Sequence, residues 1–277
     1  MTIPRRHLLP HHLHHDVAGN AAAPAVLFLH GFMGSSRDWD GVIRGFGHTT
    51  FSLAVDLPGH GASTGLPDEA YTMPGTAQAL LAVLDEREIE RCAVVGYSMG
   101  GRLALYLALH HPERCRRLVL ASASPGLQKA GEQAARRAVD EARARRLEAG
   151  DVDAFLNDWY RQPLFASLAR HPSLAETMVA QRLRNDPREL ARSLRGMGTG
   201  SQPSLWERLG ALSVATLAVA GALDAKYVAV AGRMAALSPC VRAVMVPEAG
   251  HAVHAEQPRR FVTLLHTFLK PTLLKPS

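Results

Sequence analysis

The chain has 277 residues, of which 47% are hydrophobic, enough for one large domain or for a domain with an insertion. No apolar run reaches the ~18 residues of a membrane-spanning helix, and Met1 to Pro10 has no apolar signal-peptide core. We therefore expect a cytoplasmic protein with no membrane partner. The formal charge is +6, but the arginines are scattered and no nucleic-acid-binding motif occurs, so we expect no nucleic acid partner either.

Short apolar runs alternate with helical patterns through the first part of the chain. The runs predict strands at 25–29, 50–55, 93–95 and 117–121, and the patterns between them predict helices at 73–84 and 101–109. Strands that are apolar on both faces are typical of a parallel sheet covered by helices. The alternation therefore predicts an α/β fold with a mostly parallel, doubly wound sheet.

The pattern changes after the fourth strand. Helices are predicted at 130–147, 153–160, 174–184 and 188–197, with no comparable strand between them. Alternation then resumes with strands at 215–220 and 241–246 and helices at 228–237 and 258–269. We predict a core whose first part is 1–122 and whose second part is 208–277, with a helical cap inserted at 123–207.

A candidate nucleophile lies between the strand at 93–95 and the helix that follows. Gly96, Ser98 and Gly100 form the pattern G-x-S-x-G in a strand–turn–helix context. Glycines flank the serine where a Cβ would clash in a strained turn. A chance match on a surface turn is the alternative, and the context on both sides favours the nucleophile.

A serine nucleophile needs a base and a carboxylate that orients the base. Asp224 follows the strand at 215–220, and His251 follows the strand at 241–246. The order Ser98, Asp224, His251 is that of α/β-hydrolase triads. Asp224 could instead cap a helix and His251 could be an ordinary loop histidine. His254 is the competing base, and we expect it at the rim of the site or against the following helix.

Two backbone amides are candidates for stabilising an oxyanion. Met99 N–H follows the nucleophile at a helix start, and Phe32 N–H lies in the turn after the first buried strand. Four histidines, His11, His12, His14 and His15, lie near the N-terminus on an early strand or a frayed end. They lack acidic or cysteine partners at ligand spacing, so we expect no metal site.

The motifs LHGF, DLPGHG, GYSMGG, GALD and AGH, in this order, resemble the α/β-hydrolase superfamily over nearly the whole chain. The run from Asp158 to Phe165, D-W-Y-x-Q-P-x-F, and the elbow GYSMGGR are similar to those of the 2-succinyl-6-hydroxy-2,4-cyclohexadiene-1-carboxylate (SHCHC) synthases of menaquinone biosynthesis. The D-W-Y-x-Q-P-x-F run is much more specific than G-x-S-x-G. The resemblance implies an α/β-hydrolase fold with an inserted helical cap.

The resemblance also implies a lyase reaction, the elimination of pyruvate from 2-succinyl-5-enolpyruvyl-6-hydroxy-3-cyclohexene-1-carboxylate to give SHCHC. Ser98, activated by His251 and oriented through Asp224, would abstract the proton next to the succinyl ketone. The amides of Phe32 and Met99 would hold the oxyanion. Neither a metal nor an organic cofactor is implied, and the partner is a small anionic substrate.

Arginine suits the carboxylates of such a substrate because its planar fork binds them through two hydrogen bonds. Arg102 lies one helical turn past Ser98 and is expected to point into the site. The resemblance further implies these substrate-binding residues: Tyr97, Arg136, Trp159, Tyr160, Phe165, Arg182 and Lys226. Surface arginines and packing within the cap are the alternative interpretations.

Two other functions remain open at this stage. A serine hydrolase of carboxylic esters or carbon–carbon bonds could use the same triad, since a fold does not fix a function. A non-catalytic binding protein on the same scaffold is the alternative of another class, and the complete triad argues against it. The oligomeric state is not determined by the sequence, with a monomer slightly favoured.

Overall fold

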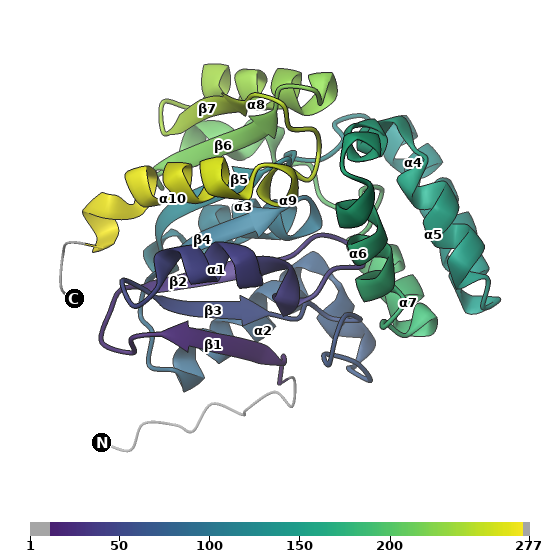
Figure 1. Cartoon of the computed structure of the whole chain (residues 1–277), viewed down its shortest axis with the longest axis horizontal. Helices are drawn as coiled ribbons and strands as arrows, with labels where there is room; N and C mark the ends of the chain where they lie inside the picture. The colour runs from purple at the N-terminus through teal and green to yellow at the C-terminus, as the bar shows by residue number, and fades with distance from the viewer. Residues whose placement is uncertain (1–11, 274–277) are drawn as a thin grey trace.

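A seven-stranded sheet runs through the middle of the molecule, as the computed structural model of residues 12–273 shows (Figure 1). The strand order is β1-β3-β2-β4-β5-β6-β7. The strands are β1 (His15–Gly19), β2 (Ala25–Leu29), β3 (Phe51–Val55), β4 (Cys92–Tyr97), β5 (Cys115–Ala121), β6 (Thr216–Gly221) and β7 (Val241–Val246). Neighbours pair in parallel except β1, which is antiparallel to β3. The carboxyl ends of β2 to β7 therefore meet at one edge.

Helices cover both faces of this sheet. On one face lie α1 (Asp40–Phe46) and α10 (Pro258–Leu273), and on the other lie α2 (Met73–Glu86), α3 (Met99–His110) and α8 (Ala225–Leu237). Val26 and Phe28 of β2 belong to the apolar cluster under α1 and α10, whereas Leu27 and Leu29 belong to the opposite cluster. Burial on both faces explains the unbroken apolar strands, and the predicted α/β fold is confirmed.

The strand β1 is the element that the apolar pattern does not reveal. Its sequence is His-Asp-Val-Ala-Gly, and its last four residues are exposed. It pairs with β3 from His15 opposite Val55 to Gly19 opposite Phe51, so backbone hydrogen bonds hold it rather than side-chain burial. His11 and the segment Met1 to Pro10 lie outside the described residues.

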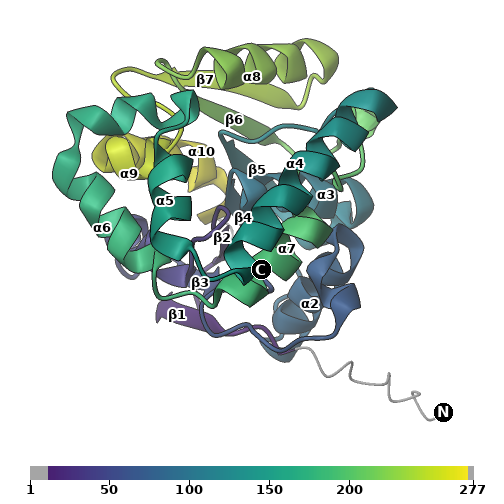
Figure 2. The ribbon, with the colours of Figure 1, turned by 90° about the vertical axis from the view of Figure 1, so that its right-hand side faces the viewer.

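A helical insertion separates β5 from β6. It consists of α4 (Ala130–Glu148), α5 (Val152–Tyr160), the 3₁₀ helix η4 (Pro163–Arg170), α6 (Pro172–Arg182) and α7 (Pro187–Met197). A second 3₁₀ helix, η5 (Trp206–Ala211), leads back to the sheet. Figures 1 and 2 show these helices beyond the carboxyl ends of the parallel strands. The insertion therefore covers the edge where α/β sheets carry their sites, while the cap boundaries 123 and 207 stay predictions.

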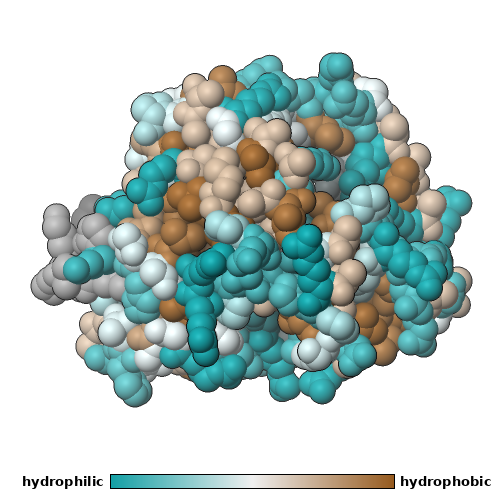
Figure 3. Space-filling model, turned by 45° about the horizontal axis from the view of Figure 1, so that its top comes forward, coloured by the Kyte–Doolittle hydropathy of each residue, from teal (hydrophilic) through white to brown (hydrophobic). Residues whose placement is uncertain are grey.

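The molecular surface mixes polar and apolar side chains. Figure 3 shows hydrophobic groups interspersed with hydrophilic ones on the face turned to the viewer. Among the described residues, no helix is both long enough and apolar enough to cross a membrane.

Candidate active site

Ser98 sits at a sharp turn between β4 and α3. Its backbone has φ +49°, in the left-handed region that L-residues rarely adopt. A Cβ on Gly96 would lie 2.4 Å from the Gly100 carbonyl oxygen, and one on Gly100 would lie 2.2 Å from the Leu29 carbonyl oxygen. Only glycine fits at either position, because Gly96 packs against the start of α3 and Gly100 packs against the end of β2.

The three residues of the predicted triad are hydrogen-bonded in a row. The Ser98 hydroxyl lies 3.3 Å from His251 Nε2, and His251 Nδ1 lies 2.9 Å from Asp224 Oδ2. The other carboxylate oxygen of Asp224 accepts the Tyr227 N–H at 3.2 Å. Asp224 is thus both a helix N-cap, the alternative weighed from sequence, and the partner of His251. Capping fixes the carboxylate in the position from which it orients the imidazole.

His251 is placed to be a neutral base. Burial lowers its pKa below the usual value of 6.5, against the opposing effect of the hydrogen-bonded Asp224 carboxylate. At neutral pH, therefore, Nδ1 carries a proton and donates a hydrogen bond to Asp224, and Nε2 is free to accept a proton from Ser98.

The competing histidine, His254, is not at the rim of the site. It is buried on the short helix α9 (Val253–Glu256), where its ring packs 4.9 Å from the Trp39 ring and 4.4 Å from the Tyr97 ring. Of the two expected positions, the rim is wrong because the α9 turn directs this side chain into the apolar core. The other, against the following helix, is found, since the His254 ring lies 6.2 Å from the Phe261 ring of α10. His251 is left as the histidine that contacts Ser98.

The two candidate oxyanion donors flank Ser98. Phe32, Ser98 and Met99 line the same cavity. The turn that carries Phe32 is held over the elbow by the Gly100 N–H, which donates to the His30 carbonyl at 3.0 Å. Within residues 12–273, neither the Phe32 nor the Met99 amide donates to a backbone carbonyl outside the regular elements. Both N–H groups are therefore available to a developing negative charge.

The cavity beside Ser98 has a volume of about 200 Å³ and lies between the sheet edge and the insertion. Its charged lining residues are all cations: Arg102, Arg136, Arg143 and Lys226. They come from α3, α4 and α8, far apart in sequence. A confined space with positive charge on several sides, and with no carboxylate among the described residues of its wall, suits a substrate with several negative charges.

Arg102 is a buried cation that has no carboxylate partner among the residues that the structure describes. Its side chain donates to the Met197 carbonyl at 2.9 Å and to Gln202 Oε1 at 3.0 Å, both neutral acceptors. Burial lowers its pKa to about 10, so it remains charged at neutral pH. A buried charge that lacks a counter-ion strongly favours the binding of an anion.

Arg136 and Arg143 reach the cavity from one face of α4. Asp140 lies between them and accepts from Arg136 Nε at 2.8 Å, while Arg143 lies 3.8 Å away. The Arg143 guanidinium also packs over the Trp159 ring at 5.1 Å and donates to Gln162 Oε1 at 2.8 Å. One carboxylate thus orients two arginines without cancelling both charges.

Four predicted substrate-binding residues lie outside the cavity lining: Tyr97, Tyr160, Phe165 and Arg182. The rings of Tyr97 and Phe165 pack behind His251, at 5.4 and 5.6 Å from its ring, and Tyr160 packs on Phe165 at 5.1 Å. Arg182 makes two hydrogen bonds to Asp38, at 2.6 and 2.7 Å, with both side chains buried. The prediction that Arg182 binds the substrate anion directly is corrected. Its guanidinium is already paired with the Asp38 carboxylate, and this ion pair joins the cap to the core.

The sequence interpretation missed Arg143 and Tyr227 as lining residues. Arg143 follows Arg136 by seven residues, so both lie on one helix face, and this spacing could have identified it. Tyr227 lines the cavity with its ring 4.7 Å from the His251 ring, and no motif signals it.

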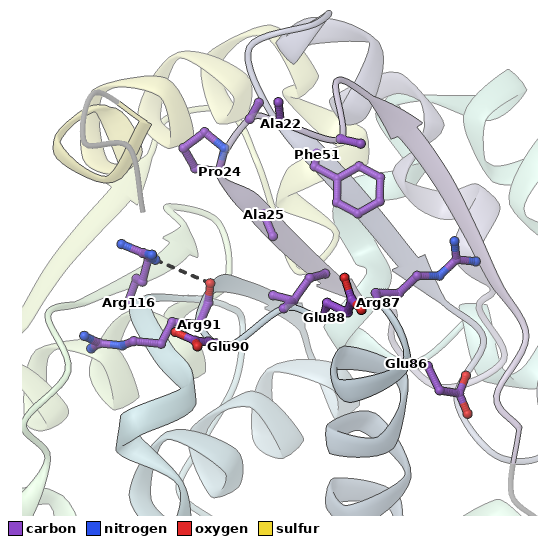
Figure 4. Close-up of a pocket in the computed structure, with 13 residues that line it drawn as sticks. Ala22, Pro24, Ala25, Phe51, Glu86, Arg87, Glu88, Glu90, Arg91 and Arg116 are labelled. Atoms are coloured by element: carbon purple, nitrogen blue, oxygen red, sulfur yellow. Dashed lines mark hydrogen bonds between the residues drawn. The ribbon is translucent and has the colours of Figure 1, made fainter.

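A larger hollow, of about 810 Å³, lies at the opposite edge of the sheet (Figure 4). Its walls come from the amino ends of β2, β3 and β5 and from the segment 86–91. Acidic and basic side chains alternate there, and Arg116 donates to the Arg91 carbonyl at 3.4 Å. Its lining contains no candidate nucleophile, and its charged side chains are of both signs. The smaller cavity is therefore the candidate site.

Metal ligands are not grouped in the described structure. Within residues 12–273, no three His, Cys, Asp or Glu side chains are placed to hold a metal ion. His12 pairs with Glu86, and His14 pairs with Asp56. That the activity needs neither a metal nor an organic cofactor stays a prediction.

Two buried histidines predict a strong loss of stability in acid. Burial holds the pKa of His60 at about 3 and that of His254 at about 4, whereas both are near 6.5 in the unfolded chain. Below pH 6.5 the unfolded state therefore binds more protons, and the free energy of unfolding falls with pH. Between pH 6.5 and pH 4.5 we expect these two groups together to lower the free energy of unfolding by about 4 kcal/mol, since each approaches ~1.4 kcal/mol per pH unit only below the unfolded pKa.

Urea unfolding at the two pH values measures this loss. His254→Gln should reduce the fall in the free energy of unfolding between the two pH values. His48→Gln, at an exposed position, should leave that fall unchanged. An equal fall in the free energy of unfolding in both variants would contradict the prediction.

A family model described as alpha/beta hydrolase fold matches residues 24–258. The chain belongs to this family.

Closer relatives narrow the classification. The chain is 35% identical over 252 residues to the 2-succinyl-6-hydroxy-2,4-cyclohexadiene-1-carboxylate synthase of Salmonella heidelberg, covering 91% of this chain and 96% of that protein. It is 34% identical to Protein PHYLLO, chloroplastic, of Arabidopsis thaliana, of whose length it spans 16%. The structure of MenH from S. aureus superposes with a TM-score of 0.89 at 36% identity, covering 93% of this chain and 98% of that one. Within the alpha/beta hydrolases, the chain is a member of the MenH-like SHCHC synthase group.

Proposed function

We propose that the protein is a lyase of menaquinone biosynthesis that eliminates pyruvate from 2-succinyl-5-enolpyruvyl-6-hydroxy-3-cyclohexene-1-carboxylate and releases SHCHC. The observation that carries this proposal is the convergence of four cations on the cavity of Ser98, whose lining holds no carboxylate in the described part of the chain. The substrate has several carboxylates, which require such a site. The identity to a named synthase over nearly its whole length supports the same reaction.

In the proposed mechanism, His251 Nε2 accepts the hydroxyl proton of Ser98, and Ser98 Oγ removes the proton next to the succinyl ketone. The electron pair moves to the ketone oxygen, where the Phe32 and Met99 amides stabilise the enolate. As the ketone re-forms, the bond from the ring to the enolpyruvyl oxygen breaks and the diene is completed. The enolpyruvate takes up the proton held by His251, which returns this base to its neutral form, and tautomerises to pyruvate. Asp224 keeps the imidazole in the required tautomer and stabilises its protonated form.

Substrate binding is assigned to the cations around the cavity. Arg102 and Lys226 approach from the core, and Arg136 and Arg143 approach from the cap. Trp159 supplies an aromatic wall against which the cyclohexene ring packs. Tyr97 and Phe165 hold His251 in place rather than contact substrate. A cytoplasmic location and a monomeric state remain predictions of the sequence.

The test is pyruvate release from the enolpyruvyl substrate, generated in place by the preceding enzyme because it decays spontaneously. Pyruvate and diene absorbance are followed with and without the protein. We expect acceleration well above the spontaneous rate. No acceleration, together with turnover of simple aryl esters, would reject the lyase and favour the second candidate.

That second candidate is a serine hydrolase of esters or carbon–carbon bonds. The hydrogen-bonded row from Ser98 to Asp224 and the two free amides would serve acyl transfer equally well. An ester substrate, however, has no need of a cavity that carries four positive charges.

The acid limb of activity should reflect His251. Its pKa is lowered by burial, and only its neutral form can accept the Ser98 proton. We therefore expect kcat/KM to be constant from pH 8 to below pH 6.5, and to fall only as the pH drops through the lowered pKa. A profile measured with saturating coupling enzyme checks this, and an inflection above pH 7 would contradict it.

A further inference from the structure

We propose that Asn185 is a positioning residue for the oxyanion hole, acting from the insertion on the turn that carries Phe32. The inference rests on the proposed function, in which the Phe32 amide stabilises the enolate. Asn185 lies in the short connection between α6 and α7 and is 8% exposed. Its amide is used at both ends: Nδ2 donates to the Met33 carbonyl at 2.8 Å, and Oδ1 accepts the Gly61 N–H at 2.9 Å.

The turn at Phe32 needs such a support. The Gly34 N–H donates to the Gly31 carbonyl at 2.9 Å, which closes a four-residue turn with Phe32 and Met33 at its centre. Met33 has φ +63°, at the turn position where glycine is usual. A non-glycine residue persists in that region only when its surroundings hold it.

The second contact of Asn185 reaches the other segment that borders Phe32. Gly61 follows His60, whose ring packs 5.7 Å from the Phe32 ring and 4.9 Å from the His30 ring. One side-chain amide thus joins the segment after Phe32 to the segment under it. The bond to Met33 is buried, so removal of the Asn185 amide leaves the Met33 carbonyl without this donor and without ready access to solvent.

Loss of this bridge should let the Phe32 N–H move out of line with the enolate oxygen. Removal of one oxyanion donor typically lowers kcat by about 10²–10³-fold. Displacing the donor should have part of that effect, so we expect Asn185→Ala to lower kcat by ~10–100-fold. KM should change little, because the cations that bind substrate lie on α3, α4 and α8.

The experiment compares Asn185→Ala and Asn185→Asp with Asp186→Ala. Asp186, the next residue, caps α7 by accepting the Arg188 and Glu189 N–H groups and is exposed. Loss of its side chain removes hydrogen bonds at the neighbouring position and should lower Tm by about 2–4 °C, without a change in contacts to the Phe32 turn. Two rates are measured: kcat for pyruvate release, and the labelling of Ser98 by a neutral fluorophosphonate, whose phosphoryl oxygen requires the same two amides.

We expect both Asn185 variants to label Ser98 at least ~10-fold more slowly than Asp186→Ala, with a parallel fall in kcat and an unchanged KM. Labelling of either Asn185 variant at the rate of the Asp186 control would overturn the inference. Labelling does not depend on the lyase reaction. If the wild type failed to release pyruvate but its labelling still required Asn185, the proposed function would fail and this inference would stand.

Discussion

Ser98→Ala is expected to lower the rate of pyruvate release by ~10³-fold or more. In the proposed mechanism the hydroxyl of Ser98 removes the proton next to the ketone, and His251 Nε2 lies 3.3 Å from it, placed to accept its proton. A water molecule in the space left by the hydroxyl would be less well oriented. Single-turnover measurements of pyruvate and diene formation, corrected for spontaneous decay, determine the loss.

A matched control exists on the neighbouring strand. Ser122 follows β5, is buried and has φ +48°, almost the conformation of Ser98, but it does not line the cavity. Ser122→Ala therefore imposes the same chemical change on a similarly strained serine, and it should keep at least half of the wild-type rate. Wild-type turnover in Ser98→Ala would show that another group removes the proton, and the mechanism would be wrong.

The core of the site was predictable because each catalytic candidate directly follows a strong strand signal. Ser98, Asp224 and His251 lie within five residues of the ends of β4, β6 and β7. The runs of β4 and β6 are wholly buried, whereas β7 contains Arg242 and is partly exposed. In a parallel sheet the ends of such strands meet at one edge, so chain order and strand order together bring the residues into contact. The observed Ser98–His251 and His251–Asp224 hydrogen bonds agree with that expectation.

The cap contacts were less predictable, since helix composition does not say which side of a helix faces the cavity. Arg136 and Arg182 look alike in sequence, yet Arg136 lines the cavity and Arg182 is paired with Asp38. What distinguishes Arg182 is its ion pair with Asp38, a residue 144 positions away in the sequence. Similarly, the burial of His254 depends on the direction of a single short turn, α9, which no periodicity encodes.

Arg102 is the residue at which binding and stability are expected to oppose each other. Arg102→Met should lower kcat/KM for the anionic substrate by ~10²-fold, equivalent to about 3 kcal/mol, because a buried charge-assisted hydrogen bond to a carboxylate is lost. The same change should leave Tm unchanged or raise it. In the free protein the guanidinium is buried and, within residues 12–273, has only the Met197 carbonyl and Gln202 as acceptors. An apolar side chain of similar length avoids the cost of desolvating a charge.

Two comparisons separate a local contact from the general effect of charge. Arg259→Met removes one positive charge from an exposed position and should leave kcat/KM within about twofold of the wild type, as expected of weak long-range attraction at physiological salt. Labelling of Ser98 by the neutral fluorophosphonate should be nearly normal in Arg102→Met, since the triad and both amides are intact. Equal losses in Arg102→Met and Arg259→Met would assign the effect to net charge. A loss confined to Arg102→Met, with Tm maintained, would mean that the protein keeps an unpaired buried cation because the substrate supplies its counter-ion.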